Sequence, residues 1–241
     1  MVLNRQTVNI KKNFFEYQAW SNQHIVIGVD EVGRGCFAGP VVAAAVILPT
    51  NKAPRMLKDS KIMTPEERSE AFIWIQKHCF YGIGVMNHRF IDEHNIVQAT
   101  RAAMIKATLN VLHISYLRPS AIVIDAMPID LSQTTFHDIP IHYFIKGETK
   151  SSSIAAASIA AKVIRDRMMG LLDPLIPGYG WLSNKGYGTV SHRNFLKNNT
   201  HSILHRKRFL AKLWQQCSKE NEQLSLPFET LDHDFDQEVI L

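Results

Sequence analysis

The chain has few cysteines and no long apolar run, and each of these shortages excludes a class of protein. Three cysteines stand far apart in 241 residues and form no Cys-x-x-Cys pair, so we expect neither a structural zinc site nor a disulfide framework. No run approaches the roughly 18 apolar residues of a membrane span. Residues 1–23 lack the apolar core of a signal peptide, and a reducing cytoplasm is the expected location.

Acidic side chains are missing from one long stretch near the C-terminus. The formal net charge of the chain is +5, yet residues 174–217 contain seven lysines and arginines and no acid. Residues 218–241 contain one lysine and seven acids, and for this tail we expect disorder. The basic stretch is a candidate surface for nucleic-acid phosphates. A solvated basic face is an equally weighted alternative.

With 46% apolar and 20% charged residues, the chain has the composition of an ordinary globular protein. Short apolar runs alternate with helical patterns. Strands are predicted at residues 25–29, 40–48, 81–86, 121–124 and 139–145, and helices at 64–77, 89–112 (as one or two helices) and 153–172.

This order indicates an α/β or α+β sheet domain. We expect this domain at residues 20–173, preceded by an N-terminal extension at 1–19. A basic helical module at 174–217 and the acidic tail at 218–241 would follow it.

Carboxylates stand at three of the predicted strand ends. Asp30 and Glu31 follow the first strand into a turn, Asp125 follows the short apolar run at 121–124, and Glu148 comes just after the last strand. If these strands are neighbours, the acids meet at one edge of the sheet and repel one another. Hard oxygen ligands suit Mg²⁺ or Mn²⁺, and two such ions can act together in phosphodiester cleavage. A loop-exposed charge is the alternative for any single acid.

Two glycines flank an arginine directly after the first acid pair. Gly33, Arg34 and Gly35 would let the backbone approach a sugar or phosphate closely, although a tight turn alone would also explain the glycines. Lys61 ends a Lys-Asp-Ser-Lys run that suits phosphate binding, with a solvated loop as the alternative.

Several motifs in this order resemble one known family. The segments are GVDEVGRG (28–35), GPVVAAAVIL (39–48), LKDSK (57–61), VIDA (123–126), IKGETKSSSIAAASIAAKVIRDR (145–167) and NKGYGT (184–189). Together they resemble bacterial ribonuclease HII, a type 2 ribonuclease H, from about residue 25 to residue 209.

The resemblance implies an α/β ribonuclease H-like fold, with a central mixed sheet flanked by helices and a C-terminal helical extension, and it makes residues 20–173 the catalytic domain. It also implies an endoribonuclease that hydrolyses the RNA strand of RNA/DNA hybrids and nicks duplex DNA 5′ to an embedded ribonucleotide. Such an enzyme takes part in DNA replication and ribonucleotide excision repair. Cleavage with two Mg²⁺ or Mn²⁺ ions would leave a 3′-hydroxyl and a 5′-phosphate. We expect a monomer.

Functional residues carry over by position in the motifs. Asp30, Glu31 and Asp125 match the catalytic, metal-binding acids of the family. The 33–35 turn matches the backbone that reads the ribose 2′-hydroxyl. Tyr187 matches the tyrosine that stacks on the following deoxyribose, in a setting that its glycine neighbours would keep mobile and accessible.

The sequence departs from the family pattern at two positions. Glu148 stands where the fourth metal-binding acid is usually aspartate, so the carboxylate is about 1.5 Å farther from the backbone and metal preference is open to change. Asn184 replaces the usual histidine of the His-Lys-Gly-Tyr run. No consequence of that second change follows from the sequence.

An apolar peptide interrupts the acidic tail. Gln223, Leu224, Leu226 and Phe228 belong to the string QLSLPF, which resembles the clamp-binding peptides of bacterial replication and repair proteins. Clustered apolar side chains in a disordered segment are typical of partner docking. The prediction is a contact with the bacterial sliding clamp; packing back on the catalytic domain is the alternative.

Two other functions fit part of the pattern. Another two-metal nuclease of the same fold, such as a resolvase or transposase, would need the strand-end acids but not the glycine turn together with the distal Lys-Gly-Tyr-Gly run. A non-catalytic hybrid-binding module would gain nothing from acids that face phosphates.

Overall fold

The computed structural model of the protein describes residues 4–5, 10–211 and 213–215. The chain divides into two compact units, Met1–Arg206 and Lys207–Leu241. All of the sheet and the helices α1 to α6 belong to the first unit, and the described part of the second is helical at residues 207–211 and 213–215. The predicted clamp-binding residues Gln223, Leu224, Leu226 and Phe228 lie outside the described residues. The predicted domain boundary at residue 173 stays a prediction.

A mixed sheet forms the centre of the first unit, in the strand order β1-β6-β5-β2-β3-β4. The strands are β1 (Asn4–Arg5), β2 (Ile25–Val32), β3 (Val41–Ile47), β4 (Phe80–Met86), β5 (Pro119–Asp125) and β6 (Ile141–Phe144). The neighbours β2, β5 and β6 run parallel, whereas β2, β3 and β4 are antiparallel. The α/β class predicted from the sequence is confirmed.

Strand β2 is longer than its apolar run predicted. Asp30, Glu31 and Val32 still pair with β3, so the two acids lie within the strand and not in the turn after it. The reason is the partner strand, because β3 continues to supply backbone donors and acceptors opposite residues whose side chains alone favour a loop. The acids are therefore fixed by a regular ladder.

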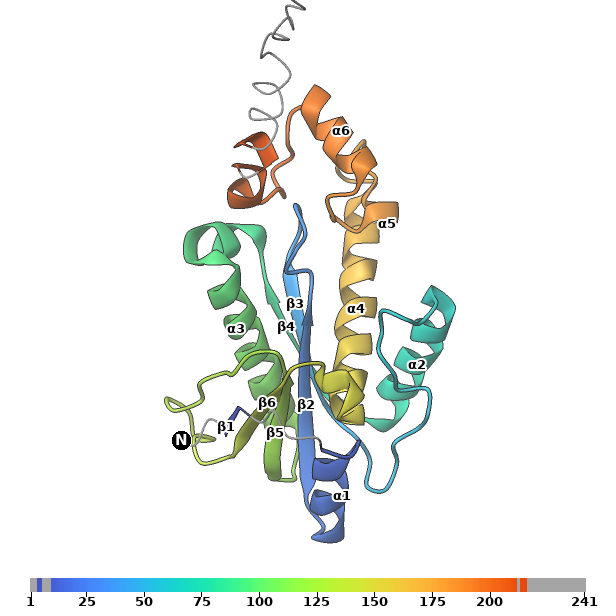
Figure 1. The fold of residues 1–241 in the computed structure, drawn as a ribbon, viewed down its shortest axis with the longest axis vertical. Coiled ribbons are helices and arrows are strands. Elements are labelled where there is room, and N and C mark those ends of the chain that lie inside the picture. Colours follow the sequence, from blue (N-terminus) through green and yellow to red (C-terminus); the bar gives the residue numbers. More distant parts are fainter. Residues whose placement is uncertain (1–3, 6–9, 212, 216–241) are drawn as a thin grey trace, which may run out of the picture. The chain divides into compact units, whose positions relative to one another are not determined.

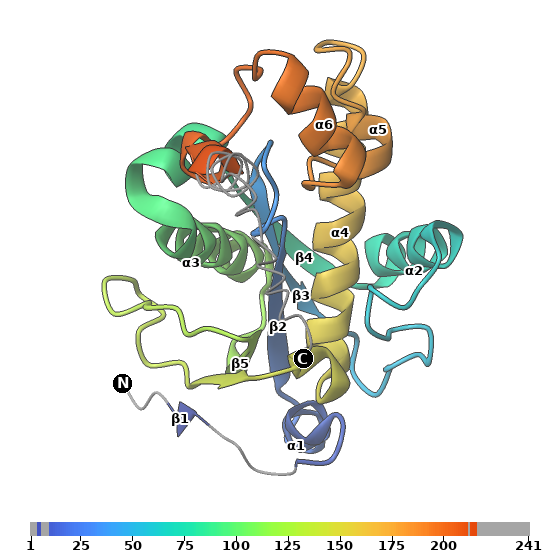
Figure 2. The ribbon, with the colours of Figure 1, turned by 45° about the horizontal axis from the view of Figure 1, so that its top comes forward.

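Helices cover both faces of the sheet (Figures 1 and 2). The helix α3 lies on one face, against β2, β3 and β4; α4 lies on the other, against β2 and β3, with α2 packed on its outer side. The helices are α1 (Phe14–Ser21), α2 (Pro65–His78), α3 (His88–Ile114), α4 (Ser152–Leu172), α5 (Trp181–Asn184) and α6 (Val190–Asn198), with a 3₁₀ turn, η1 (Gly147–Thr149). No helix in the described residues is long and apolar enough to span a membrane.

Small residues let α4 approach the sheet closely. A Cβ on Gly28 of β2 would lie 2.1 Å from the backbone of Ser153 in α4, so only glycine fits there. The alanines of α4 are fully buried against the sheet and α2, where interior packing is dense. The helix is thereby held directly above the strand that carries Asp30 and Glu31.

Local caps account for the helix boundaries on either side. The predicted helix at 64–77 is confirmed as α2, where Thr64 and Glu67 cap each other and Pro65 occupies the first turn. The predicted helix at 89–112 is α3, and its non-helical Asn95 separates two helical segments. The Asn95 side chain accepts from the amides of Val97 and Gln98, so it caps the second segment.

The N-terminal helix α1 was not predicted, and it braces the start of α4. Glu16 is buried and its Oε1 accepts hydrogen bonds from the Ser151 hydroxyl and, at 3.1 Å, from the Ser153 amide. The Asn13 side chain accepts from the Ser152 amide at 2.8 Å. These bonds satisfy amides at the helix N-terminus that would otherwise lack partners.

Candidate active site

Acids from two parallel strands face one cavity. Asp30 and Glu31 of β2 and Asp125 at the end of β5 line a cavity of about 460 Å³. The two strands are adjacent and parallel, so their C-terminal ends reach the same edge of the sheet, as predicted. The structure does not place Glu148 in the lining of this cavity, although η1 follows β6, which pairs with β5.

Burial raises the pKa values of Asp30, Glu31 and Glu148, and neighbouring carboxylates add to each shift. Burial, and then the charges of Glu31 and Asp125, raise the pKa of Asp30 well above its ordinary value. Burial also raises the pKa of Glu31, while Arg34, 3.2 Å from Glu31 Oε1, opposes that shift. The pKa of Glu148 is raised by burial and by the neighbouring charges of Asp125 and Asp59. A site that raises carboxyl pKa values favours either protons or cations.

Hydrogen bonds satisfy the acids only in part. Asp30 Oδ1 accepts from the Glu31 amide at 2.7 Å, and Asp125 Oδ1 accepts from the Gly147 amide at 2.7 Å. Among the described residues, the buried Oε2 atoms of Glu31 and Glu148 have no hydrogen-bond partner. Buried oxygens without partners are costly, and they suit a hard divalent cation.

The described side chains do not form a complete metal cage. No group of three or more His, Cys, Asp or Glu residues in the described part of the chain could hold a metal ion as it stands. The donor set nevertheless fits one, because carboxylates surround the cavity and no histidine lines it. Oxygen-only donors favour Mg²⁺ or Mn²⁺ over zinc.

The predicted glycine turn forms one wall of the same cavity. Gly33, Arg34 and Gly35 all line it. Gly33 has a φ of +91°, and a Cβ there would lie 2.1 Å from Arg165, so the fold itself requires glycine at this position. A Cβ on Gly35 would meet nothing within 4 Å. The missing side chain at Gly35 therefore leaves space on the cavity side.

Two buried arginines support the wall of the cavity, one at the turn and one at the segments beside it, and sequence reasoning missed both. Arg206 donates to the carbonyls of Gly33, Arg34 and Gly39 at 2.8 to 3.0 Å. Arg165 of α4 donates to the carbonyls of Ala38 and Pro40, and to that of Lys185 in the loop before Tyr187, at 2.9 to 3.2 Å. Both side chains are fully buried. Arg206 belongs to the basic stretch at 174–217 that is predicted to form a surface, and for this residue the prediction is wrong, because its side chain is fully buried and donates to backbone carbonyls.

Lys61, which lies between Glu31 and Asp125 in the sequence, and Tyr187, which follows all of the acids, also line the cavity. The Tyr187 ring is half-buried, with Lys162 Nζ 5.5 Å and the Arg165 guanidinium 5.7 Å from its centre. Burial and the neighbouring Cys36 raise the pKa of the Tyr187 phenol to about 12. The phenol therefore remains protonated at neutral pH.

Close packing and hydrogen bonds surround the loop of Tyr187. A Cβ on Gly186 would lie 2.5 Å from the carbonyl oxygen of Ala38, so the glycine serves close packing, and the expected mobility of the Tyr187 ring stays a prediction. Asn184 accepts from the Gly186 amide at 2.8 Å and donates to the Tyr179 carbonyl at 2.7 Å. The asparagine at this position thus braces the loop.

Further polar residues of the cavity come from α4 and the 60–68 region. Ser158 and Lys162 line it with Ser60 and Arg68, and the hydroxyls of Ser60 and Ser158 lie 2.9 Å apart. The sequence does contain a pattern that could have identified the polar residues of α4. Ser158, Lys162 and Arg165 interrupt an alanine- and isoleucine-rich helix at spacings of four and three residues, which places them on one face.

Comparison with known proteins supports one family. A family model for ribonuclease HII matches residues 27–217. A ribonuclease HII of Levilactobacillus brevis is 42% identical over 196 residues, which cover 81% of this chain and 72% of that protein. A ribonuclease HII of Alkaliphilus metalliredigens is 43% identical over 202 residues, covering 82% of this chain and 96% of that one.

Solved structures share the fold at lower sequence identity. Ribonuclease H2 of Pyrococcus horikoshii has a TM-score of 0.63 at 24% identity, covering 81% of this chain and 99% of that chain. The PCNA:RNase HII complex of Archaeoglobus fulgidus gives 0.62 at 24%, covering 76% and 94%. Bst-RNase HIII with Mn²⁺ gives 0.63 at 20%, covering 90% and 77%. The predicted ribonuclease H-like fold is confirmed.

Proposed function

The chain belongs to the ribonuclease HII family, and from that membership we propose how its cavity performs the reaction. The protein is a divalent-metal-dependent endoribonuclease that hydrolyses the RNA strand of RNA/DNA hybrids and nicks duplex DNA at embedded ribonucleotides. One observation carries the assignment of residues. Asp30, Glu31 and Asp125 line a single cavity with the 33–35 turn and Tyr187, although these residues come from distant parts of the chain.

Asp30, Glu31, Asp125 and Glu148 are the metal-holding acids in this proposal. The raised pKa values of Asp30, Glu31 and Glu148 and the partnerless oxygens of Glu31 and Glu148 support it, because a bound cation would relieve both. Two divalent ions, when bound, supply Lewis acidity at the scissile phosphate and lower the pKa of a water nucleophile. The preferred ion is Mg²⁺ or Mn²⁺.

The turn of Gly33, Arg34 and Gly35 reads the ribose. The carbonyls of Gly33 and Arg34 are occupied by Arg206, which fixes the direction of the peptide groups of the turn. The space at Gly35 allows a sugar to approach the backbone closely. A rigid backbone that hydrogen-bonds the 2′-hydroxyl distinguishes RNA from DNA, since deoxyribose lacks that group.

Tyr187 recognises the junction between the ribonucleotide and the following deoxyribonucleotide. Its ring lines the cavity beside Lys162, where a flat aromatic surface and a cation suit a sugar and its phosphate. Lys61, on the loop side of the same cavity, binds a phosphate of the scissile strand.

The acidic tail binds a sliding clamp through Gln223, Leu224, Leu226 and Phe228. The support is the apolar string itself and the Archaeoglobus relative, which was solved as a complex with PCNA. A clamp would raise the effective concentration of the enzyme on newly made DNA. On the basis of the sequence, we also propose that the protein is a monomer in the cytoplasm.

A single-ribonucleotide duplex tests the proposed reaction. The enzyme is incubated with this duplex and with an all-deoxy duplex of the same sequence, in the presence of Mg²⁺ or Mn²⁺. We expect one nick 5′ to the ribonucleotide, a 3′-hydroxyl and a 5′-phosphate at the nick, and an intact all-deoxy control. Cleavage at positions set by the structure of the duplex, and not by the ribonucleotide, would indicate another nuclease of this fold. Binding of the duplex without cleavage would indicate a binding module.

A further inference from the structure

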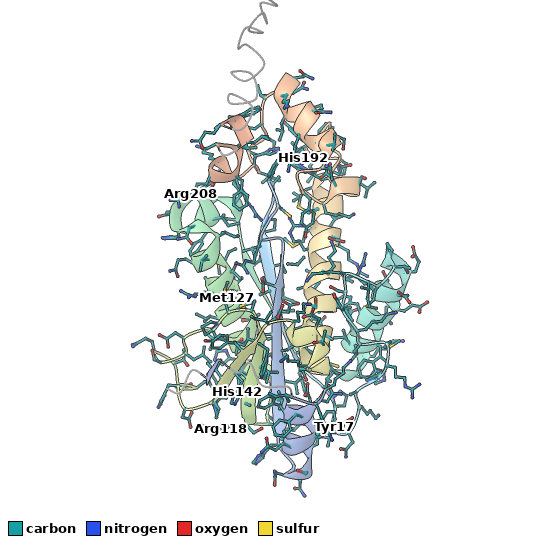
Figure 3. The ribbon with its side chains drawn as sticks, viewed as in Figure 1. Tyr17, Arg118, Met127, His142, His192 and Arg208 are labelled. Atoms are coloured by element: carbon teal, nitrogen blue, oxygen red, sulfur yellow. The ribbon has the colours of Figure 1, made fainter. Side chains whose placement is uncertain are left out.

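Two buried histidines form a hydrogen-bonded path that ends at Tyr187. His192 of α6, labelled in Figure 3, has Nδ1 2.9 Å from the carbonyl oxygen of Tyr187. Its Nε2 lies 3.1 Å from Nε2 of His205. His205 Nδ1 lies 3.0 Å from the Ser202 amide and 2.8 Å from the Ser202 hydroxyl. Neither histidine lines the cavity of the acids.

The backbone amide of Ser202 fixes the direction of the whole path. An amide can only donate, so His205 Nδ1 is an acceptor and the proton of neutral His205 sits on Nε2. That proton is donated to His192 Nε2, which leaves the proton of His192 on Nδ1. His192 Nδ1–H therefore donates to the Tyr187 carbonyl. Each ring is held in one tautomer, and the two tautomers differ.

The surroundings of the pair keep both rings neutral. Burial lowers the pKa of His192, and burial together with the neighbouring His192 lowers the pKa of His205 to about 4. The other titratable groups that oppose a charge on His205 are His88 and His201. The aromatic rings of Tyr179, Trp181 and Phe37 pack against the pair. A protonated ring would also lose the acceptor that the path requires.

His205 also links the path to the glycine turn. It pairs with Ala38 through a backbone bridge, and its neighbour Arg206 donates to the carbonyls of Gly33 and Arg34. One dipeptide thus holds the turn on one side and, through His192, the Tyr187 peptide on the other. The two recognition elements share a single support.

We propose that His192 and His205 are positioning residues, which orient the Tyr187 peptide and thereby set the enzyme's preference for a ribonucleotide–deoxyribonucleotide junction. The inference rests on the proposed role of Tyr187. Neither ring touches the substrate in this account; both act through the carbonyl of Tyr187. The Tyr187 peptide is oriented by one hydrogen bond, which His192 Nδ1–H donates to the Tyr187 carbonyl. A neutral histidine has this donor only in its less common tautomer, with the proton on Nδ1.

Nitrogen NMR on the wild-type protein tests the tautomers directly. In protein labelled with ¹⁵N-histidine at pH 7, long-range ¹⁵N–¹H correlations distinguish a protonated from an unprotonated ring nitrogen. We expect His192 to carry its proton on Nδ1 and His205 on Nε2. A proton on Nε2 of His192, or a positively charged ring at either position, would overturn the proposal.

Two substitutions of His192 then separate positioning from packing. His192→Asn keeps an N–H donor where Nδ1 stood, whereas His192→Gln keeps a polar group where Nε2 stood and removes the donor to Tyr187. The readout is the ratio of kcat/KM on a single-ribonucleotide duplex to kcat/KM on a uniform RNA/DNA hybrid. We expect His192→Gln to lower this ratio about tenfold, which is the scale of one hydrogen bond. His192→Asn should keep it within about twofold.

Tyr187→Ala, measured on the same two substrates, separates this inference from the proposed function. If Tyr187→Ala lowers the ratio but the two His192 variants behave alike, the positioning role is wrong while the role of Tyr187 stands. If Tyr187→Ala leaves the ratio unchanged, the role of Tyr187 is wrong and the inference falls with it. Should a His192 variant fail to fold in a thermal unfolding check, the tautomers in the wild-type protein still decide.

Discussion

Arg206 Nη2 lies 2.8 Å from the carbonyl oxygen of Gly33, although 173 residues separate them in the chain. The same guanidinium donates to Arg34 and Gly39. Burial lowers the pKa of this guanidinium to about 10, yet it remains charged at neutral pH. The glycine turn is thus held from the far end of the first unit.

Replacing Arg206 should therefore destabilise the fold. Arg206→Ala removes the guanidinium that donates to three backbone carbonyls, and we expect a loss of about 3–5 kcal/mol in the free energy of unfolding. Arg55→Ala, at an exposed position, should change it by less than about 0.5 kcal/mol. Urea unfolding of the wild type and both variants measures the difference, and similar small losses in both would contradict the role assigned to Arg206.

Asp30→Asn should stabilise the metal-free protein at neutral pH. The folded-state pKa of Asp30 is raised above the ordinary value of 3.8, so the folded state binds the proton more tightly than the unfolded chain. The wild type therefore loses stability as pH rises from about 4 through the raised pKa, and the asparagine variant does not.

The measurement is urea unfolding in EDTA at pH 5 and pH 8. Asp30→Asn should gain about 1–2 kcal/mol over the wild type at pH 8 and less at pH 5. Asp138→Asn is the control, because Asp138 forms an exposed ion pair with Arg118 and such pairs contribute little. If Asp30→Asn were less stable than the wild type at pH 8, the ionised Asp30 carboxylate would not be destabilising the folded state.

Tyr187→Ala should cost more on a single embedded ribonucleotide than on a long hybrid. Stacking on the sugar after the ribonucleotide is specific to the junction, and such stacking is worth ~1–3 kcal/mol. Tyr187→Phe is the matched control, since it keeps the ring and removes only the hydroxyl beside Cys36. Comparison of kcat/KM on both substrates gives the answer, and equal losses on the two would make Tyr187 a structural residue.

A peptide of residues 218–241 should bind the bacterial sliding clamp. The apolar side chains would fill a groove on the clamp, as short anchors in disordered segments commonly do. Calorimetric titration is made alongside a peptide in which Gln223, Leu226 and Phe228 are changed to alanine. Absence of binding by the wild-type peptide at ~100 μM, or equal binding by both peptides, would rule out this role for the tail.

The sequence motifs predicted most of the residues that line the cavity, but not the buried arginines that hold the surrounding backbone. The acids, the glycine turn and Tyr187 belong to contiguous motifs, and parallel neighbouring strands bring the acids to one edge, as expected from runs that end in charge. Arg165 and Arg206 could not be assigned in this way, because their partners are backbone carbonyls, which have no signature in the sequence. The sequence alone does not distinguish a buried arginine from a solvated one.

Tertiary pairing also decided features that local patterns did not. The apolar run of β2 ends at Val29, but pairing with Ala43 and Ala44 extends the strand through Asp30 and Glu31. Helix α1 has too little periodicity to be recognised, and its contacts with the start of α4 hold it in place. The bracing role of Asn184 depends on its hydrogen bonds to Gly186 and Tyr179, which no local sequence pattern predicts.

Cleavage by Asp30→Asn and Asp125→Asn tests the assigned metal site most directly. Each substitution removes one ligand charge while leaving a side chain of the same shape, so thermal unfolding should show a folded protein. On a single-ribonucleotide duplex in millimolar Mg²⁺, we predict that both variants make no detectable nick under conditions where the wild type cuts to completion. Near-wild-type nicking by either folded variant would contradict the assignment of the acids, and with it the proposed reaction at this cavity.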